Sequence, residues 1–317
     1  MARALDRSQT LYLRRVQDVG RKAILLAATN RGVRGFMSRY GMRLGASRFV
    51  AGETLEQCLT TLAELNDKGL YANTTLLGED VTTRDETQDV VAAYLEVLDR
   101  IADRGLRANV ALKLTHLGLL IDEELAFENV AVVVAHAAER HNSVRIDMEH
   151  SAVVDATLRI YRRLREAGRD NVGAVLQAYL YRTPGDLEAL LPLEPNLRLV
   201  KGAYLEPEAV AYPHKADVDA AYRTLLERAL AGGAYVAVAT HDESLIEDTI
   251  ALGYDKSRFE FQMLYGVRPQ LQLDLVARGF KVLVATPFGP QWYPYLMRRL
   301  AERPANVLFF AKNVVQR

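Results

Sequence analysis

Residues 144–178, VRIDMEHSAVVDATLRIYRRLREAGRDNVGAVLQA, contain the repeating unit on which the fold depends. Val144–Met148 and Gly173–Ala178 are short β-rich runs, and the longer stretch Val153–Ala167 between them has apolar residues at helical spacing. Two parallel strands need a crossover connection of about a dozen residues or more, and a helix usually supplies it. The stretch is therefore typical of one β–α–β unit.

The same alternation runs from about residue 70 to the end of the chain. Six further runs are strand candidates, namely Leu70–Leu77, Asn109–Thr115, Leu197–Val200, Tyr235–Thr240, Arg258–Met263 and Lys281–Thr286. Helical stretches with turn signals lie between strands, namely Thr83–Arg104, Asp122–Arg140, Ala216–Ala231 and Glu243–Leu252. Eight units predict an α/β protein with a (β/α)₈ barrel of the TIM type, which takes about 250 residues.

Doubly wound sheets share this alternation and are the main alternative. The chain lacks the Gly-x-Gly-x-x-Gly turn that a dinucleotide-binding sheet has after its first strand, and the number of units also favours the barrel. We therefore expect an N-terminal helical arm over residues 1–69 and a barrel over residues 70–317.

The first 50 residues are strongly basic, with 11 Lys and Arg against two acidic residues, a net charge of +9. Apolar residues recur there at helical spacing between arginines, namely Val16, Val19, Ala23 and Leu26. This pattern predicts a basic amphipathic helix, which could dock on the barrel or bind an anionic membrane surface. An arginine-rich, acid-poor start also resembles a transit peptide.

Composition excludes several classes of protein. The whole chain has 40 Lys and Arg against 40 Asp and Glu, so no overall field favours nucleic acid, and we expect no nucleic-acid partner. No run approaches the roughly 20 apolar residues of a membrane span, and the start lacks a secretory signal. We expect a cytoplasmic protein, with peripheral contact on the inner membrane face open. The single cysteine, Cys58, predicts a packing role.

Polar side chains follow nearly every predicted strand at its carboxyl end, which is where barrels of this type have their active sites. These residues are Glu79, Lys113, His116, Asp147, Glu149, His150, Gln177, Lys201, Thr240, His241 and Gln262. Barrel interiors otherwise hold Val, Ile and Leu, so the set indicates catalysis or ligand binding, although a single member such as His150 can simply pair at the rim.

Residue types alone leave two further chemistries open. Asp147, His150 and His241 could hold the metal of a TIM-barrel hydrolase, although the spacing is poor because no His-x-His closes the first strand. Lys113 or Lys201 could form a Schiff base, since a second lysine nearby would lower the pKa of the first.

Arg298 and Arg299 are adjacent in the last predicted helix. Their planar guanidinium groups suit a carboxylate, because each can donate two parallel hydrogen bonds. Adjacent helical positions diverge by about 100°, so both reach one anion only if this helix lies across the mouth of the barrel.

An ordered set of motifs runs from about residue 70 to the end of the chain. The motifs are LLGE at Glu79, ALKLT at Lys113, IDME at Asp147, VLQAYLYR at Gln177, RLVKGAYLE from Arg198, ATHD at His241, FEFQMLYG at Gln262 and YLMRRLAE at Arg298. The set resembles the proline dehydrogenase family, an FAD-dependent barrel that occurs alone or as a domain of proline utilisation A. The resemblance implies a distorted barrel with its last helix over the mouth and a catalytic domain that binds flavin and substrate.

Substrate contacts are implied by the resemblance. Arg298 and Arg299 would grip the substrate carboxylate, and Glu79 would pair with Arg298 to close the site. Lys113 and Tyr204 would pack against the substrate ring.

The implied catalytic residues are Asp147, which would hold Lys113 in place, and Arg198, which would lie near flavin N5 and stabilise the electron density that arrives there. Contacts to FAD are implied for Met148, Gln177, Arg198, Lys201, Gly202, Ala203, Thr240, His241, Glu302 and Phe309. No metal ligand is implied.

The implied reaction is the oxidation of L-proline to 1-pyrroline-5-carboxylate, the first step of proline catabolism. A hydride would pass to flavin N5 and the electrons to a quinone, and a separate 1-pyrroline-5-carboxylate dehydrogenase could take the product. One position departs from the family, which usually has a tyrosine where Ala285 stands. That tyrosine crowds the substrate ring, so its absence predicts weaker discrimination between proline and 4-hydroxyproline.

Overall fold

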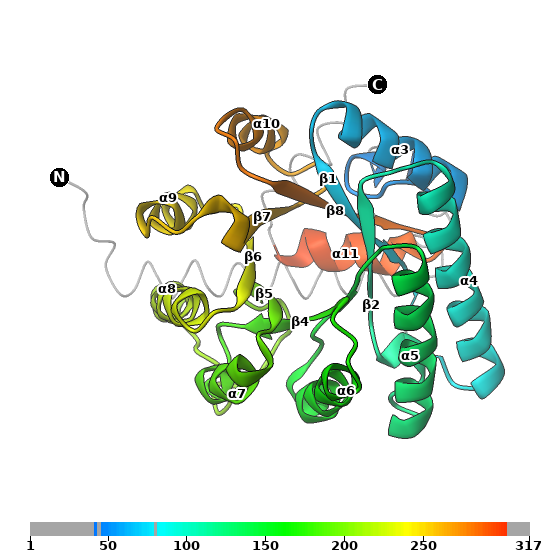
Figure 1. Cartoon of the computed structure of the whole chain (residues 1–317), viewed down its shortest axis with the longest axis horizontal. Helices are drawn as coiled ribbons and strands as arrows, with labels where there is room; N and C mark the ends of the chain where they lie inside the picture. Colours follow the sequence, from blue (N-terminus) through cyan, green and yellow to red (C-terminus); the bar gives the residue numbers. More distant parts are fainter. Residues whose placement is uncertain (1–40, 43–45, 79–80, 303–317) are drawn as a thin grey trace.

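Eight strands close into a barrel in chain order, and every neighbouring pair is parallel, including the pair of first and last strands (Figure 1). This computed structural model describes residues 41–42, 46–78 and 81–302, with the backbone alone for 298–302. The strands are β1 (Tyr71–Leu76), β2 (Ala108–Leu112), β3 (Val144–Ile146), β4 (Val172–Gln177), β5 (Asn196–Val200), β6 (Tyr235–Ala239), β7 (Phe259–Leu264) and β8 (Val282–Phe288). The predicted barrel is confirmed.

Seven helices follow the first seven strands and lie in an outer layer around them (Figure 1). They are α4 (Arg84–Asp103), α5 (Glu123–Glu139), α6 (Val154–Glu166), α7 (Thr183–Leu190), α8 (Lys215–Ala231), α9 (Glu243–Ala251) and α10 (Pro269–Ala277). Their starts follow local rules. Thr83 and Glu86, for example, form a capping box that satisfies the first free backbone N–H groups of α4.

The helix after β8 departs from this pattern. In the view of Figure 1, α11 (Trp292–Glu302) crosses the ring of strands instead of lying in the outer layer. Its apolar side chains pack against Leu77, which directly follows β1, so α11 lies at the carboxyl ends of the strands. This is the expected position of the last helix over the mouth.

The outer place beside β8 and β1 is filled by α3 (Leu55–Asp67), which contacts both strands. Cys58 of α3 is buried against Thr74, with 3.2 Å between Sγ and Oγ1, and burial raises the pKa of its thiol to about 12. The part of the predicted arm that the structure describes therefore contributes a helix to the barrel's layer. The predicted amphipathic helix over residues 16–26 lies outside the described residues.

Side chains alternate between the interior of the barrel and the helical layer, because residues paired across parallel strands point to the same side. Near the mouth, the inward residues of seven strands or of the residues that directly follow them are half-buried, namely Thr75, Lys113, Asp147, Val200, Ala239, Leu264 and Ala285, whereas Gln177 of β4 is buried. Solvent therefore reaches the interior at the carboxyl ends of the strands, where a site was expected.

The opposite end of the barrel is filled by a buried arginine. Arg145 of β3 donates to the backbone oxygens of Ala174 and Asn196, at 3.0 and 2.7 Å, and to the Asn196 side chain. Burial and the nearby Arg198 lower its pKa to about 10. Gly173 makes room for it, since a β-carbon at that position would lie 2.3 Å from Arg145 Nη1.

Two predicted strands end two or more residues earlier than expected. The run Asn109–Thr115 leaves β2 at Leu112, and the run Val144–Met148 leaves β3 at Ile146. After β2 the chain turns away from the strand direction, because Leu114 has helical backbone angles and Thr115–Leu117 form a short 3₁₀ helix. The buried Glu149 carboxylate accepts bonds from both the backbone N–H and the hydroxyl of Thr115, at 3.1 and 2.6 Å.

Across residues 41–42, 46–78 and 81–302, we find no helix that combines the length and the hydropathy of a membrane span.

Candidate active site

Arg198 of β5 joins the strand ends into one site. Its side chain is buried in the barrel and donates three hydrogen bonds, from Nη1 to Asp147 Oδ1 at 2.5 Å, from Nη2 to Asn73 Oδ1 at 2.7 Å, and from Nε to Gln262 Oε1 at 2.5 Å. These partners come from β1, β7 and the residue after β3. The two residues predicted to be catalytic, Asp147 and Arg198, thus form an ion pair in the interior.

Asn73 belongs to this cluster although no sequence motif marks it. Asn73 also donates to Asn109 Oδ1 at 2.5 Å, and Asn109 donates to Ser143 Oγ at 3.2 Å. Asn73 and Asn109 lie at inward positions of two neighbouring strands, where apolar residues are usual. Two polar residues at such positions could have indicated the site.

Lys113 lies one residue beyond β2, half-buried, and the alternation from Ala111 places it on the inward face. The ion pair that the structure gives Asp147 is the one with Arg198. The predicted support of Lys113 by Asp147 stays a prediction.

Gln177 ends β4 on the inward face and is 3% exposed. Its Nε2 donates to the backbone oxygen of Glu149 at 3.0 Å, which fixes the segment that follows β3. Met148 in that segment is buried as well. Gln177 therefore contacts the segment that contains both Asp147 and Met148. The predicted flavin contacts of Gln177 and Met148 stay predictions.

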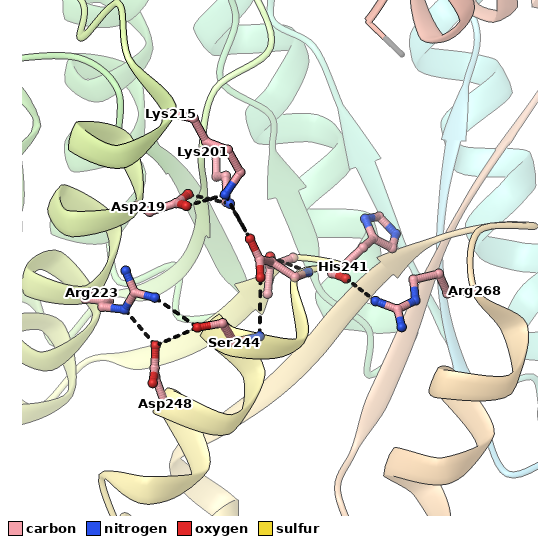
Figure 2. Close-up of polar contacts among 10 residues, drawn as sticks. Lys201, Lys215, Asp219, Arg223, His241, Ser244, Asp248 and Arg268 are labelled. Atoms are coloured by element: carbon pink, nitrogen blue, oxygen red, sulfur yellow. Dashed lines mark hydrogen bonds and ion pairs between the residues drawn. The ribbon is translucent and has the colours of Figure 1, made fainter. Parts of the chain in front are cut away.

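Lys201 follows β5 and belongs to an alternating network of charges (Figure 2). Its ammonium donates to Asp219 of α8 at 2.5 Å and to Asp242 at 3.0 Å. Lys215, the first residue of α8, bonds the same two carboxylates. The hydrogen bond from Lys201 lowers the pKa of Asp242 from its ordinary value to about 2. Burial acts in the opposite direction but is the smaller effect. Burial raises the pKa of Asp219, but the bonds from both lysines outweigh it and hold that pKa below its ordinary value.

Thr240 and His241 follow β6 beside this network (Figure 2). His241 Nε2 accepts a bond from the backbone N–H of Leu264 at 2.8 Å, so this nitrogen carries no proton and the ring is neutral. The Thr240 hydroxyl accepts from the backbone N–H of Asp242 at 3.1 Å, and Arg268 donates to the backbone oxygen of His241 at 2.9 Å.

The loop after β5 begins with a glycine that the packing requires. Gly202 has a φ of +119°, and a β-carbon there would lie 2.2 Å from the ring of Tyr179. Ala203 is exposed, and Tyr204 is half-buried with its ring edge-on to His150 at 6.3 Å. Glu206 then anchors the loop by accepting bonds from the backbone N–H and hydroxyl of Ser151, at 2.6 and 2.5 Å.

Ala285 of β8 is paired in register with Asn73, so its side chain faces the interior beside the Arg198 cluster. It is half-buried, whereas its outward neighbours Val284 and Thr286 are fully buried. The inward position next to Asn73 is therefore open to the mouth.

The remaining predicted residues lie partly or wholly outside the description. Glu79 and Phe309 are outside the described residues, and Arg298, Arg299 and Glu302 are described only as backbone of α11. Their helix lies over the mouth, but their side-chain roles stay predictions.

A metal centre receives no support from the geometry. Within the described ranges, no three His, Cys, Asp or Glu side chains are grouped as metal ligands are. Asp147 instead pairs with Arg198, and His241 Nε2 is occupied by a backbone N–H. The alternative of a hydrolase using Asp147, His150 and His241 is thus not supported.

Comparison with known proteins gives a consistent result. Residues 58–312 match the family described as "Proline dehydrogenase". "Proline dehydrogenase 1" of Bacillus subtilis (strain 168) is 40% identical over 301 residues, covering 94% of this chain and 99% of the relative. "Proline dehydrogenase" of Deinococcus radiodurans is also 40% identical, over 95% of this chain and 99% of the relative.

A solved structure shares the fold. The crystal structure of proline utilization A (PutA) from Bdellovibrio bacteriovorus, inactivated by N-propargylglycine, superposes with a TM-score of 0.77 at 23% identity. The match covers 89% of this chain and 36% of that chain.

Proposed function

Because the chain belongs to the proline dehydrogenase family, we propose that it oxidises L-proline to 1-pyrroline-5-carboxylate, the first step of proline catabolism. The observation that carries the proposal is the buried cluster around Arg198, in which a guanidinium is fixed by Asp147, Asn73 and Gln262 at the open end of the barrel. Relatives at 40% identity over nearly the whole chain bear the name of this activity.

The substrate is an amino acid whose carboxylate needs cationic partners. Arg298 and Arg299 belong to α11, the helix over the mouth, and we assign them to that carboxylate, with Glu79 pairing with Arg298. Lys113 and Tyr204, both half-buried at the mouth, would contact the ring.

The residues after β5 and β6 fit the anionic part of FAD. Gly202 lets the loop after β5 pack closely on Tyr179, because a β-carbon there would collide with that ring. The N-termini of α8 and α9 meet there through Lys215 and Asp242, and helix N-termini favour anions. Lys201 donates to two carboxylates, which leaves a third N–H for a phosphate oxygen.

We assign this region to the cofactor with Lys201, Gly202, Ala203, Thr240 and His241, and extend it to Met148, Gln177, Glu302 and Phe309. FAD, when bound, would supply the acceptor for a hydride from the ring carbon next to nitrogen.

Arg198 and Asp147 would act on the charge that develops during the reaction. A fixed cation stabilises incoming electron density more than a mobile one, because no reorganisation is needed. Asp147 holds one nitrogen of Arg198 at 2.5 Å and so keeps the guanidinium in place. The substrate amine must lose its proton before the hydride leaves.

Electron acceptor and partners extend the proposal. We propose a quinone as the acceptor and a separate 1-pyrroline-5-carboxylate dehydrogenase as the enzyme that takes the product. The basic residues 1–50 would hold a cytoplasmic protein at the inner membrane face near that quinone, because an anionic surface attracts clustered arginines.

The proposal also extends to the choice between proline and 4-hydroxyproline. The space beside Ala285 would accommodate the hydroxyl of 4-hydroxyproline, since no bulky side chain occupies that inward position.

The proposal is tested by the colour of the purified protein. We expect a yellow protein whose flavin absorption bleaches when L-proline is added without oxygen and returns when a soluble quinone is added. A colourless preparation that binds no added FAD, or activity abolished by a chelator, would contradict it.

A further inference from the structure

A chain of buried polar side chains leads from Arg198 toward the amino-terminal end of the barrel. Gln262 accepts the bond from Arg198 Nε, and its own Nε2 donates to Glu260 Oε1 at 2.5 Å. Glu260 is 3% exposed. Its other oxygen accepts bonds from the Tyr235 hydroxyl at 2.9 Å and from the Lys281 ammonium at 2.8 Å.

The Gln262 amide has one orientation that satisfies both neighbours. Arg198 Nε can only donate a hydrogen bond, and an ionised Glu260 can only accept one. If the amide turned over, two donors would meet at Arg198 and two acceptors would meet at Glu260. Both contacts would be repulsive in a buried site, where electrostatic interactions are strongest.

Glu260 keeps the charge that this orientation needs. Burial raises its pKa, but the charge and hydrogen bond of Lys281 and the bond from Gln262 outweigh burial and hold that pKa below its ordinary value. The buried Arg145 acts in the same direction.

We propose that Glu260 is a positioning residue, which orients the Gln262 amide so that its oxygen holds Arg198 Nε and thereby fixes the guanidinium for the reaction. Asp147 and Asn73 hold the other two nitrogens, so three of the five N–H groups of Arg198 are engaged by these bonds. Glu260 acts only through Gln262. This inference rests on the proposed function, which places Arg198 beside the reacting groups.

The test compares Glu260→Gln, Gln262→Met and the double variant in the FAD-loaded protein. A displaced Arg198 would stabilise the reduced flavin less, so both single variants should make its reduction potential more negative. Each single variant should also slow flavin reduction by L-proline about tenfold. The double variant should slow it about tenfold as well, because both changes break the same link.

Tyr235→Phe is the matched control, because it removes a bond to Glu260 but leaves the Gln262 link intact. It should lower thermal stability and leave the reduction potential at the wild-type value. The inference is overturned if Glu260→Gln also lowers thermal stability but leaves the reduction potential at the wild-type value. It is overturned as well if the double variant slows flavin reduction about a hundredfold, as two independent sites would.

Two further measurements test the inference if Glu260→Gln does not fold or if no flavin is bound. If Glu260→Gln does not fold, Glu260→Asp keeps the charge on a shorter side chain and should shift the potential in the same direction, so an unchanged potential counts against the inference. A crystal structure of a Glu260 variant without cofactor should show the contact between Arg198 Nε and Gln262 Oε1 lost, and a retained contact would overturn the inference. That readout needs no flavin, whereas a wild-type protein that binds no flavin would defeat the proposed function instead.

Discussion

Gly202 packs so closely on Tyr179 that a β-carbon at residue 202 would lie 2.2 Å from the tyrosine ring. Real atoms do not approach this closely, so either the ring or the loop after β5 must move when the glycine is replaced. Because that loop carries Lys201 and Tyr204, the contact links the packing under β4 to the proposed cofactor and substrate contacts.

Gly202→Ala should therefore weaken FAD binding at least tenfold and destabilise the fold by about 2–4 kcal/mol, from the strained φ and the clash together. Cofactor titration and denaturant unfolding measure the two effects. Gly233→Ala is the matched control, since Gly233 also has a positive φ, +92°, but has open space where its β-carbon would be. It should cost only about 1 kcal/mol and leave FAD affinity unchanged. Equal losses in the two variants would contradict the packing argument.

Gly173→Ala should destabilise the barrel by about 3 kcal/mol, because the new methyl group would displace Arg145 from its backbone acceptors in a buried site. Gly185→Ala in α7 should have the opposite effect on the free energy of unfolding. Apart from its chain neighbours and the backbone of its own helix, no heavy atom lies within 4 Å of its β-carbon position, so alanine should stabilise the helix by about 0.5–1 kcal/mol. Urea unfolding of both variants checks the prediction, which fails if Gly173→Ala is neutral.

Asp242→Asn should reduce stability by about 2 kcal/mol at pH 7, because it removes the charge that Lys201 and Lys215 stabilise while keeping an N-cap acceptor for α9. The folded-state pKa of Asp242, about 2, lies below its ordinary value of 3.8. Its contribution is therefore complete above the unfolded-state pKa and is lost as the pH falls toward 2. The difference between wild type and variant should shrink to about half at pH 3.

Denaturant unfolding across this pH range measures the difference. Asp248→Asn, in the more exposed pair with Arg223, is the control and should change stability by less than about 0.5 kcal/mol at either pH. A pH-independent loss for Asp242→Asn would mean that the carboxylate contributes packing instead of charge.

Ala285→Tyr should raise the preference for proline over 4-hydroxyproline about tenfold in kcat/KM, since the ring would fill the inward space beside Asn73. Steady-state assays with both substrates give the ratio. Negligible turnover of hydroxyproline by the wild type, together with no change in the variant, would refute the role of this position.

Much of the fold was predictable because burial imposes its own pattern. Short β-rich runs placed all eight strands, and the helical stretches expected to begin at Thr83 and Asp122 have these two residues as their N-caps. The early ends of β2 and β3 were not predicted, and the bond that joins the segments after them links Thr115 to Glu149, 34 residues apart.

The site was predictable in residue types but not in pairing. Strand-end position and family motifs indicated Asp147 and Arg198, yet nothing in the sequence paired them. Asn73 stood inside a strand without any motif, and Glu260 lay in the FEFQMLYG motif, where Gln262 alone was singled out. Lys201 shows the same limit, since its partners Asp219 and Asp242 lie 18 and 41 residues away. Contacts of this kind follow from how the strands close, which local spacing does not encode.

The placement of α3 has a consequence for motion at the mouth. Because α3 covers the outer face of β8 and β1, α11 is not needed to shield that face from solvent. Lifting α11 would uncover a small cluster formed by Trp292, Tyr293, Leu296 and Met297 with Val50 and Leu77, and would leave the main core intact. If the proposed substrate enters past α11, its entry would require only this local opening and not unfolding of the barrel.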